Sequence, residues 1–169
     1  MFALVIGGAA SGKSAWAEEY VSKQPGKPIY LATMQPYGEE GLARVKKHRE
    51  QRHEKGFDTL ERYTDLAHAP VPVGSSVLLE DLGNLAANEL YSPEGGGTEA
   101  VLEGIEFLFR RCDNLTVVAN EVFSGGQAYA DDTLRYLSEL ARLHRILAGK
   151  ADLVVELVCG LPNILKGVD

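Results

Sequence analysis

Long hydrophobic runs, cysteine motifs and an excess of basic charge are all missing from this sequence. No apolar run approaches the roughly 20 residues that a membrane-spanning helix requires, so we expect no membrane span. The first apolar run covers only residues 2–6 and has no basic residues before it, which predicts a strand and not a signal peptide. Cys112 and Cys159 lie far apart without CxxC spacing, a pattern typical of buried free thiols in a reducing cytoplasm.

The balance of charge excludes a further class of function. The formal net charge of −7 at pH 7 argues against a general nucleic-acid binder, so we expect no nucleic-acid partner. A length of 169 residues suggests one domain, covering 1–169, and a hydrophobic content of 45% is enough for a full core. We therefore expect a cytoplasmic, globular protein that handles any phosphate ligand with locally concentrated positive charge.

Apolar segments with the character of strands alternate with segments patterned as helices. Strands or short extended segments are predicted at 2–6, 28–32, 58–63, 77–80, 115–119 and 153–158, and helices at 13–22, 39–55, 82–90, 98–111 and 130–147. Thr98 is expected to cap its helix, and Gly160-Leu161-Pro162 to end the last strand. Continuous apolar strands are typical of a parallel sheet covered on both faces, so we predict an α/β fold with ligands bound beyond the carboxyl ends of the strands.

A glycine-rich loop joins the first strand to the first helix. It reads Gly7-Gly8-Ala9-Ala10-Ser11-Gly12-Lys13-Ser14, which is G-x-x-x-x-G-K-S between a strand and a helix. Backbone N–H groups of such a loop bind nucleotide phosphates, Lys13 would reach the outer phosphates, and Ser14 would offer its hydroxyl to Mg²⁺. Glu80 ends a strand where P-loop enzymes place the acidic partner of Mg²⁺. The alternative is an ordinary glycine-rich turn, but the motif and its flanks favour a P-loop NTPase-like fold with a mostly parallel sheet and helices on both faces.

A second feature is the basic segment within the predicted helix 39–55. Six of the 17 Lys and Arg residues lie there: Arg44, Lys46, Lys47, Arg49, Arg52 and Lys55. Residues 40, 44, 48 and 52 recur every four positions and so share one helical face, which brings His48 between two arginines. This pattern suits a site that handles phosphate, and it is equally compatible with a solvated, charged helix.

Together these motifs resemble the bifunctional adenosylcobinamide kinase / adenosylcobinamide-phosphate guanylyltransferase family. The matching segments are the P-loop, Tyr30-Leu31-Ala32-Thr33, the R-V-x-x-H-R-x-x-R run from Arg44 to Arg52, Thr59-Leu60-Glu61, Leu78-Leu79-Glu80, Asn120-Glu121-Val122, Ala151-Asp152-Leu153-Val154 and Gly160-Leu161-Pro162. The P-loop alone is generic, whereas its combination with the histidine and arginine run is specific. Within the loop, Ala10 stands where the family usually has arginine.

The resemblance implies two activities and a set of ligands. One activity phosphorylates adenosylcobinamide, and the other transfers GMP from GTP to adenosylcobinamide phosphate through a covalent GMP–histidine intermediate. It implies ATP, GTP and Mg²⁺ as ligands and a homo-oligomeric assembly. The matching catalytic residues are His48, Lys13, Arg49 and Arg52, and the metal would be held by Ser14 and Glu80. Besides the P-loop, the residues that match nucleotide-contacting positions are Thr33, Met34, Gln35, Arg49, Glu50, Gln51, Arg52, Glu61 and Glu80.

Two other functions stay open from the sequence. A P-loop kinase for another small molecule would use the basic helix as a lid and transfer the γ-phosphate without a covalent nucleotide. A non-catalytic nucleotide-binding module would bind nucleotide without turnover, although His48 and the surrounding arginines disfavour it.

Overall fold

The protein is built on one twisted sheet with strand order β3-β2-β4-β5-β1-β6-β7. The computed structural model describes residues 1–36, 50, 52–124 and 129–167. The strands are β1 (Phe2–Gly7), β2 (Pro28–Ala32), β3 (Asp58–Glu61), β4 (Ser76–Glu80), β5 (Asn114–Asn120), β6 (Leu153–Val158) and β7 (Leu161–Lys166). Six of them pair in parallel, and β7 runs antiparallel to β6, which confirms the predicted mostly parallel sheet.

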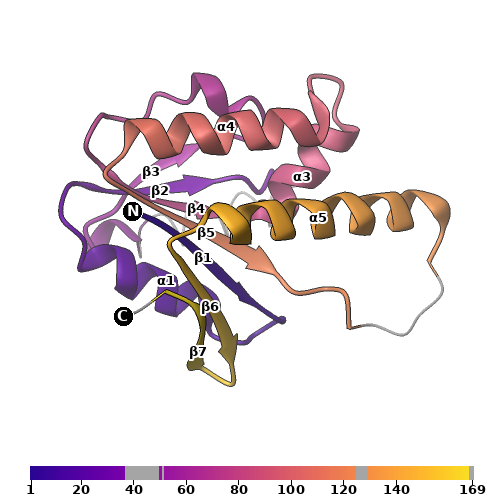
Figure 1. Ribbon diagram of the computed structural model, residues 1–169. Helices are drawn as coiled ribbons and strands as arrows, with labels where there is room; N and C mark the ends of the chain where they lie inside the picture. The colour runs from indigo at the N-terminus through magenta and orange to yellow at the C-terminus, as the bar shows by residue number, and fades with distance from the viewer. Residues whose placement is uncertain (37–49, 51, 125–128, 168–169) are drawn as a thin grey trace.

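Helices cover both faces of this sheet (Figure 1). They are α1 (Lys13–Ser22), the short 3-10 helix η1 (Leu66–His68), α3 (Leu82–Tyr91), α4 (Gly97–Arg111) and α5 (Asp131–Lys150). Helices α3, α4 and α5 lie over one face and α1 lies over the other. Alternate residues of β1 serve the two cores: Phe2 and Leu4 pack with the three helices, and Ala3 and Val5 pack on the side of α1. Side chains alternate across a strand, so a strand buried on both faces must be apolar throughout.

The carboxyl-terminal hairpin differs from the prediction. The segment at Gly160 was expected to end the last strand, but Cys159 and Gly160, with φ of 52° and 79°, reverse the chain and lead into β7. Pro162 in β7 is compatible with a strand at the edge of a sheet, where a missing N–H breaks no ladder. Cys112 is buried and Cys159 is exposed, so the buried-thiol prediction is right for the first and wrong for the second. Burial raises the pKa of the Cys112 thiol to about 11.

Four of the five predicted helices are confirmed, with one correction at a helix start. Helix α4 begins at Gly97 with Gly96 as its N-cap, and the Thr98 hydroxyl donates to Glu139 Oε2 at 2.7 Å, so Thr98 is not the cap. A Cβ added at Gly96 would lie 2.7 Å from the Cβ of Ala100, and the Gly96 N–H donates to Glu89 Oε2 at 2.7 Å. Of the predicted helix 39–55, the structure describes residue 50 and 52–55, of which 50 and 52–54 are helical.

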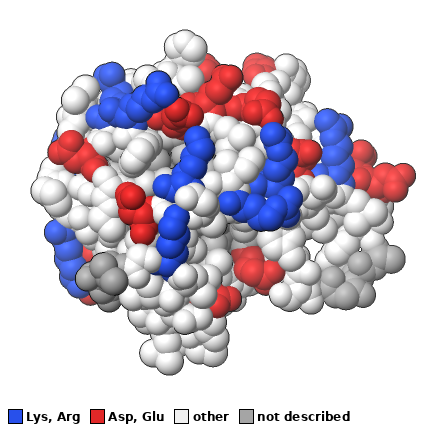
Figure 2. Space-filling view, viewed as in Figure 1, with Lys and Arg blue, Asp and Glu red and all other residues white. Residues whose placement is uncertain are grey.

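Charges of both signs are interspersed over the face formed by α4 and α5 (Figure 2). Arg142 of α5 pairs with Glu99 of α4 at 2.6 Å, and Lys150 of α5 contacts Glu106 of α4 at 3.4 Å. Exposed pairs of this kind contribute little to stability, because water and salt screen the two charges. Within the described ranges, no helix is both long and apolar enough to cross a membrane.

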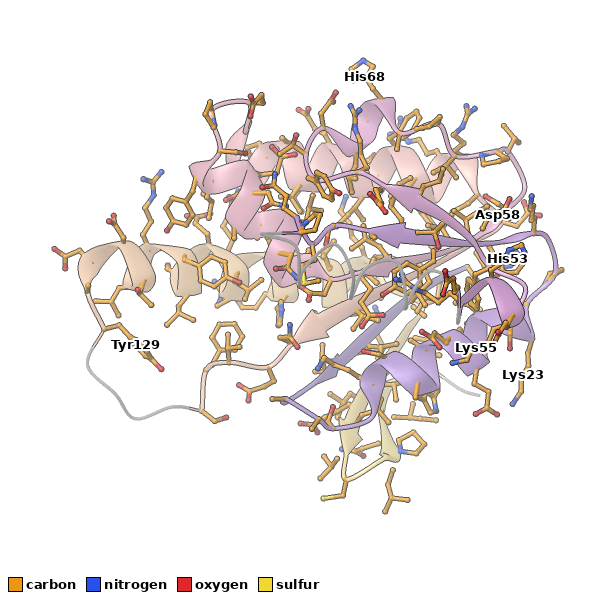
Figure 3. All side chains as sticks on the ribbon, turned by 180° about the vertical axis from the view of Figure 1, so that it is seen from behind. Lys23, His53, Lys55, Asp58, His68 and Tyr129 are labelled. Carbon is orange, nitrogen blue, oxygen red and sulfur yellow. The ribbon has the colours of Figure 1, made fainter. Side chains whose placement is uncertain are left out.

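Behind this face, residues 53–58 lie at the same end of the sheet as Lys23 at the end of α1 (Figure 3). Figure 3 shows His53, Lys55 and Asp58 close to that end, with His68 on the other side of the sheet. An ion pair between Lys55 and Glu18 joins the described end of the basic segment to α1. The basic segment therefore approaches the helix that follows the glycine-rich loop.

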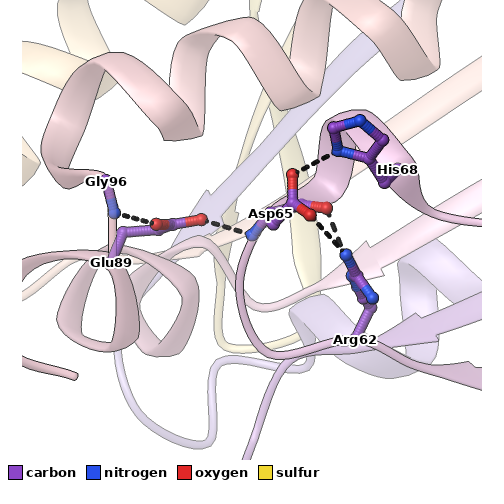
Figure 4. Close-up of polar contacts among 5 residues, drawn as sticks. All are labelled: Arg62, Asp65, His68, Glu89 and Gly96. Carbon is purple, nitrogen blue, oxygen red and sulfur yellow. Dashed lines mark hydrogen bonds and ion pairs between the residues drawn. The ribbon is translucent and has the colours of Figure 1, made fainter. Parts of the chain in front are cut away.

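Two loops above the sheet are held by Glu89 of α3, which is only 2% exposed (Figure 4). Its Oε1 accepts from Asp65 N and its Oε2 from Gly96 N, each at 2.7 Å. The Asp65 side chain in turn contacts Arg62 at 2.6 Å and His68 at 2.8 Å. One carboxylate thus fixes both the turn after β3 and the entry to α4.

Candidate functional site

The glycine-rich loop lies at the carboxyl end of β1, where β5 and β6 flank it on either side. Gly12 has a φ of 91°, a left-handed conformation that side chains other than glycine rarely adopt, and an added Cβ would lie 3.2 Å from Gly160 Cα. Gly160 N also donates to Ser11 O at 2.9 Å. The turn between β6 and β7 therefore supports the loop from outside, which sequence reasoning did not indicate.

Positive groups gather where the loop enters α1. Lys13 is 8% exposed, and its Nζ donates to Gly8 O at 3.0 Å, so the ammonium lies over the loop. No acidic residue occupies the first turn of α1, whose N-terminal N–H groups favour an anion. The loop residues Gly7, Gly8, Ala9, Ala10, Ser11, Gly12, Lys13 and Ser14 thus form the strand–loop–helix arrangement that the motif requires.

Four side chains from separate elements form a connected chain beside the loop. The Ser14 hydroxyl donates to Glu80 Oε1, and the Tyr30 hydroxyl donates to Glu80 Oε2 at 2.9 Å. The Arg52 guanidinium lies over the Tyr30 ring, with Cζ 3.7 Å from the ring centroid. Two of the predicted site residues, Ser14 and Glu80, are therefore in direct contact, and Arg52 is joined to them through Tyr30.

The electrostatics of Glu80 fit a ligand for a cation. Burial raises the pKa of the Glu80 carboxyl, and the hydrogen bonds from Ser14 and Tyr30 partly oppose that rise. A partly desolvated carboxylate gains most when a positive charge binds to it. The donor set of one carboxylate and one hydroxyl also fits Mg²⁺, which takes oxygen ligands and usually binds through one or two carboxylates together with substrate phosphates.

Asp81 also lies at the carboxyl edge of the sheet, directly after β4, and the sequence did not indicate a role for it. Burial raises the pKa of its carboxyl, while backbone N–H groups and the Lys13 charge oppose the rise. Its Oδ1 accepts from Asn84 N at 2.7 Å, which caps α3, and Asn120 Nδ2 at the end of β5 lies 3.3 Å from its Oδ2. The peptide bond between Glu80 and Asp81 is cis. The only sequence signal was that Asp81 immediately precedes a helix and follows a strand end.

The segment after β2 reaches a cleft on the same side. Thr33 is fully buried, and its hydroxyl donates to Asp81 O at 2.8 Å, so it joins the ends of β2 and β4. Met34 is 45% exposed. Gln35 and Glu61 line a cleft of about 560 Å³, together with residues 62–65 and Glu94. Two of the predicted nucleotide contacts therefore share one cleft, whereas Thr33 presents no free side chain to it.

Of the remaining predicted site residues, one lines another cleft and three lie outside the described residues. Glu50 lines a different cleft, of about 830 Å³, with His53, Phe57 and Asp58 among its other residues. His48, Arg49 and Gln51 lie outside the described residues. Arg52 is therefore the described arginine of the basic segment, and it is 7% exposed.

The sheet order, the strand–loop–helix motif and the Ser14–Glu80 contact define a P-loop nucleotide-binding protein. The fold resembles that of the flagellar accessory protein FlaH from Methanocaldococcus jannaschii, with a TM-score of 0.50 and 10% identity over 98% of this chain and 78% of that one. A protein-family model described as cobinamide kinase / cobinamide phosphate guanyltransferase matches residues 3–165. The chain belongs to this family and is a transferase, which confirms the resemblance drawn from its motifs.

Curated relatives agree over nearly their whole length. The bifunctional adenosylcobalamin biosynthesis protein CobP of Pseudomonas aeruginosa is 32% identical over 97% of this chain and 96% of that protein. The bifunctional adenosylcobalamin biosynthesis protein CobU of Escherichia coli K12 is 31% identical over 90% of this chain and 88% of that protein. The protein of the same name from Salmonella typhimurium is 28% identical over 98% of this chain and 100% of that protein.

Proposed function

We propose that this protein phosphorylates adenosylcobinamide and then transfers GMP from GTP to the resulting phosphate. The observation that supports both steps is the continuous contact from Ser14 through Glu80 and Tyr30 to Arg52, which joins the P-loop to the basic segment. Family membership supports the identity of the substrates. A single triphosphate-binding site that serves both steps would account for two reactions in one small domain.

The kinase step uses the loop and the end of β4. The hydroxyl of adenosylcobinamide attacks the γ-phosphorus of a nucleoside triphosphate, a new O–P bond forms, the bond from the γ-phosphorus to the bridging oxygen breaks, and the hydroxyl proton is released. Lys13 and the N-terminus of α1 stabilise the negative charge on the phosphates. Ser14 and Glu80 would hold Mg²⁺, which when bound neutralises the phosphate oxygens.

The guanylyl step uses the histidine of the basic segment. A neutral imidazole nitrogen of His48 attacks the α-phosphorus of GTP, so that an N–P bond forms and pyrophosphate leaves. A phosphate oxygen of adenosylcobinamide phosphate then attacks the same phosphorus, the N–P bond breaks, and adenosylcobinamide-GDP is formed. The step divides one displacement into two. Arg49 and Arg52 neutralise charge on the phosphorus oxygens, and Gln35 and Glu61, which line one cleft, would contact the nucleoside.

Covalent labelling tests this proposal. Protein incubated with GTP labelled at the α-phosphorus should carry an acid-labile label after denaturing electrophoresis, and a His48→Asn variant should carry none. The matched control is His53→Asn, a histidine at the described end of the same segment, which should be labelled like the parent protein. Labelling that persists in His48→Asn would contradict the assignment, and γ-phosphate transfer without any label would favour a small-molecule kinase.

We also propose that the protein acts in the cytoplasm as a homo-oligomer. Exposed apolar side chains on the β6–β7 hairpin support assembly, with Val158 52%, Leu161 70% and Leu165 54% exposed. Sedimentation equilibrium should give a mass that is a multiple of 18.3 kDa. A mass of one chain at micromolar concentration would contradict the proposal.

A further inference from the structure

Tyr30 connects two groups that the proposed function places in different steps. It lies in the middle of β2, and its hydroxyl donates to Glu80 Oε2 at 2.9 Å. The face of its ring lies against the guanidinium of Arg52, 3.7 Å from the ring centroid to Cζ. One side chain therefore contacts both the proposed Mg²⁺ ligand and the proposed phosphate-binding arginine.

The surroundings of Tyr30 leave it little freedom to turn. The ring of Phe57 packs edge-on against it, with centroids 6.4 Å apart and planes at 85°, and Phe57 is 1% exposed. The hydroxyl of Tyr30 is also held, because it donates to a carboxylate oxygen of Glu80. Its position is fixed by the backbone too, because Tyr30 pairs in register with Leu78, two residues before Glu80.

The two oxygens of the Glu80 carboxylate accept hydrogen bonds from two different hydroxyls, and this indicates what Tyr30 contributes to the site. Ser14 donates to one carboxylate oxygen and Tyr30 to the other. Ser14 is itself a proposed Mg²⁺ ligand, so the oxygen of Glu80 that faces Ser14, Oε1, would be the one available to a cation. The hydrogen bond from Tyr30 to Oε2 would remain, and it would keep the other carboxylate oxygen, Oε1, directed toward the loop. A cation above an aromatic ring is likewise held over its face, which sets the position of Arg52.

We propose that Tyr30 is a positioning residue that orients Glu80 for the metal and Arg52 for the nucleotide. The inference rests on the proposed function, since it assumes that Glu80 and Arg52 have the roles given above. It assigns the two contacts to two separable parts of one side chain: the hydroxyl serves Glu80 and the ring serves Arg52. Removing them one at a time should therefore give different defects.

The experiment compares Tyr30→Phe with Tyr30→Leu in the full chain. Mn²⁺ serves as a paramagnetic probe for the metal, and its affinity for the complex of protein with a non-hydrolysable GTP analogue is measured by electron paramagnetic resonance. Tyr30→Phe should weaken Mn²⁺ binding on the order of tenfold, as expected for the loss of a hydrogen bond to a charged group. Its KM for GTP in guanylyl transfer should change less than about twofold, because the ring still supports Arg52.

Tyr30→Leu removes the ring as well. It should weaken Mn²⁺ binding to the same extent and raise the KM for GTP on the order of tenfold. The matched control is Tyr91→Phe, which deletes an exposed hydroxyl that donates to Asp132 O at 2.7 Å in α5, and it should behave like the parent protein in both measurements. Melting temperatures of all variants separate a loss of folding from a loss of positioning.

The outcomes separate this inference from the proposed function. If the parent protein transfers GMP and Tyr30→Phe binds Mn²⁺ as tightly as the parent, Tyr30 does not orient Glu80 and the inference is overturned while the function stands. Equal KM values for Tyr30→Leu and Tyr30→Phe would overturn the ring's role in the same way. If Tyr30→Leu fails to fold, the Mn²⁺ affinity of Tyr30→Phe still decides the first half. If the parent neither transfers GMP nor forms the label, the function fails independently of the Mn²⁺ comparison.

Discussion

Two carboxylates, Glu80 and Glu89, are each bound by two donors, but the donors differ in kind. Glu80 at the end of β4 accepts from two side-chain hydroxyls, those of Ser14 and Tyr30. Glu89 in α3 accepts from two backbone N–H groups, of Asp65 and Gly96. A hydroxyl can rotate and accept a new partner, whereas a backbone N–H moves only with its chain.

This difference in donors distinguishes Glu80, a carboxylate suited to binding a ligand, from Glu89, a carboxylate that holds two loops in place. Glu80 can exchange the Ser14 hydroxyl for a cation without any movement of the backbone. Glu89 is 2% exposed and fixes two loops, so losing it means rearranging both. Burial raises the pKa of Glu80, which identifies it as the carboxylate that is held at a cost to stability, as is common at functional sites.

The largest expected effect comes from removing the charge at Glu80. Glu80→Gln keeps the shape and a carbonyl oxygen but loses the anionic ligand, so both transfer activities should fall about 100-fold or more. Steady-state rates at saturating Mg²⁺ and nucleotide provide the measurement, and an unchanged or higher melting temperature serves as the control. Retention of activity within a few-fold would remove Glu80 from the site.

The next effect is on stability and belongs to Glu89. In Glu89→Gln a single carbonyl oxygen cannot satisfy both backbone donors, and the amide would face one of them, so the free energy of unfolding should fall by about 1–3 kcal/mol. Urea denaturation measures this loss. Transfer activity per folded molecule at low temperature should remain near that of the parent protein. An inactive but fully stable Glu89→Gln would reverse the assignment of the two carboxylates.

A smaller effect is expected at Asp81, whose carboxylate accepts from a backbone N–H, as Glu89 does, and from a side chain, as Glu80 does. Its Oδ1 accepts from Asn84 N at 2.7 Å, so Asp81→Ala should lose the cap of α3 and about 1 kcal/mol of stability. Asp81→Asn keeps an acceptor oxygen and should keep most of that stability. Equal melting temperatures for the two variants would show that the cap contributes nothing.

The smallest effect is a pH dependence of stability at Glu80. Because folding raises the pKa of this carboxyl, the unfolded chain releases the proton first, and stability is lost as pH rises through the unfolded and then the folded pKa. Glu80→Gln removes that loss. In metal-free buffer its melting temperature relative to the parent should therefore be higher at pH 7 than at pH 4, while Glu89→Gln stays below the parent at pH 7. A difference of the opposite sign would contradict the raised pKa.

The sequence predicted the P-loop well because every residue that shapes it is contiguous. Gly7 to Ser14 are a local motif, and the flanking strand and helix follow from local patterns. The same applies to the parallel strands, whose apolar runs show that both faces are buried. The family membership also followed from motifs in the right order.

The Tyr30 contacts were not predictable in this way. They depend on β2 lying beside β4, which places residue 30 near residue 80, and nothing in one sequence gives that strand order. The β7 strand was missed because Pro162 and Gly160 are turn and breaker signals, which only an edge position makes compatible with a strand. The contacts of Asp81 were not predicted, because they depend on the start of α3 and on Asn120 from β5.

The sheet order also governs when the nucleotide site is formed during folding. Strand β1 precedes the other strands along the chain, yet its two neighbours are β5 and β6, so that Phe2 pairs with Leu115 and Ala3 with Leu153. Contacts this distant along the chain make folding slow, because the loop closure must come before the gain from pairing. The P-loop, which begins at the end of β1, therefore lacks one of its two flanking strands until β6 has been synthesised, and phosphate binding must come after that point.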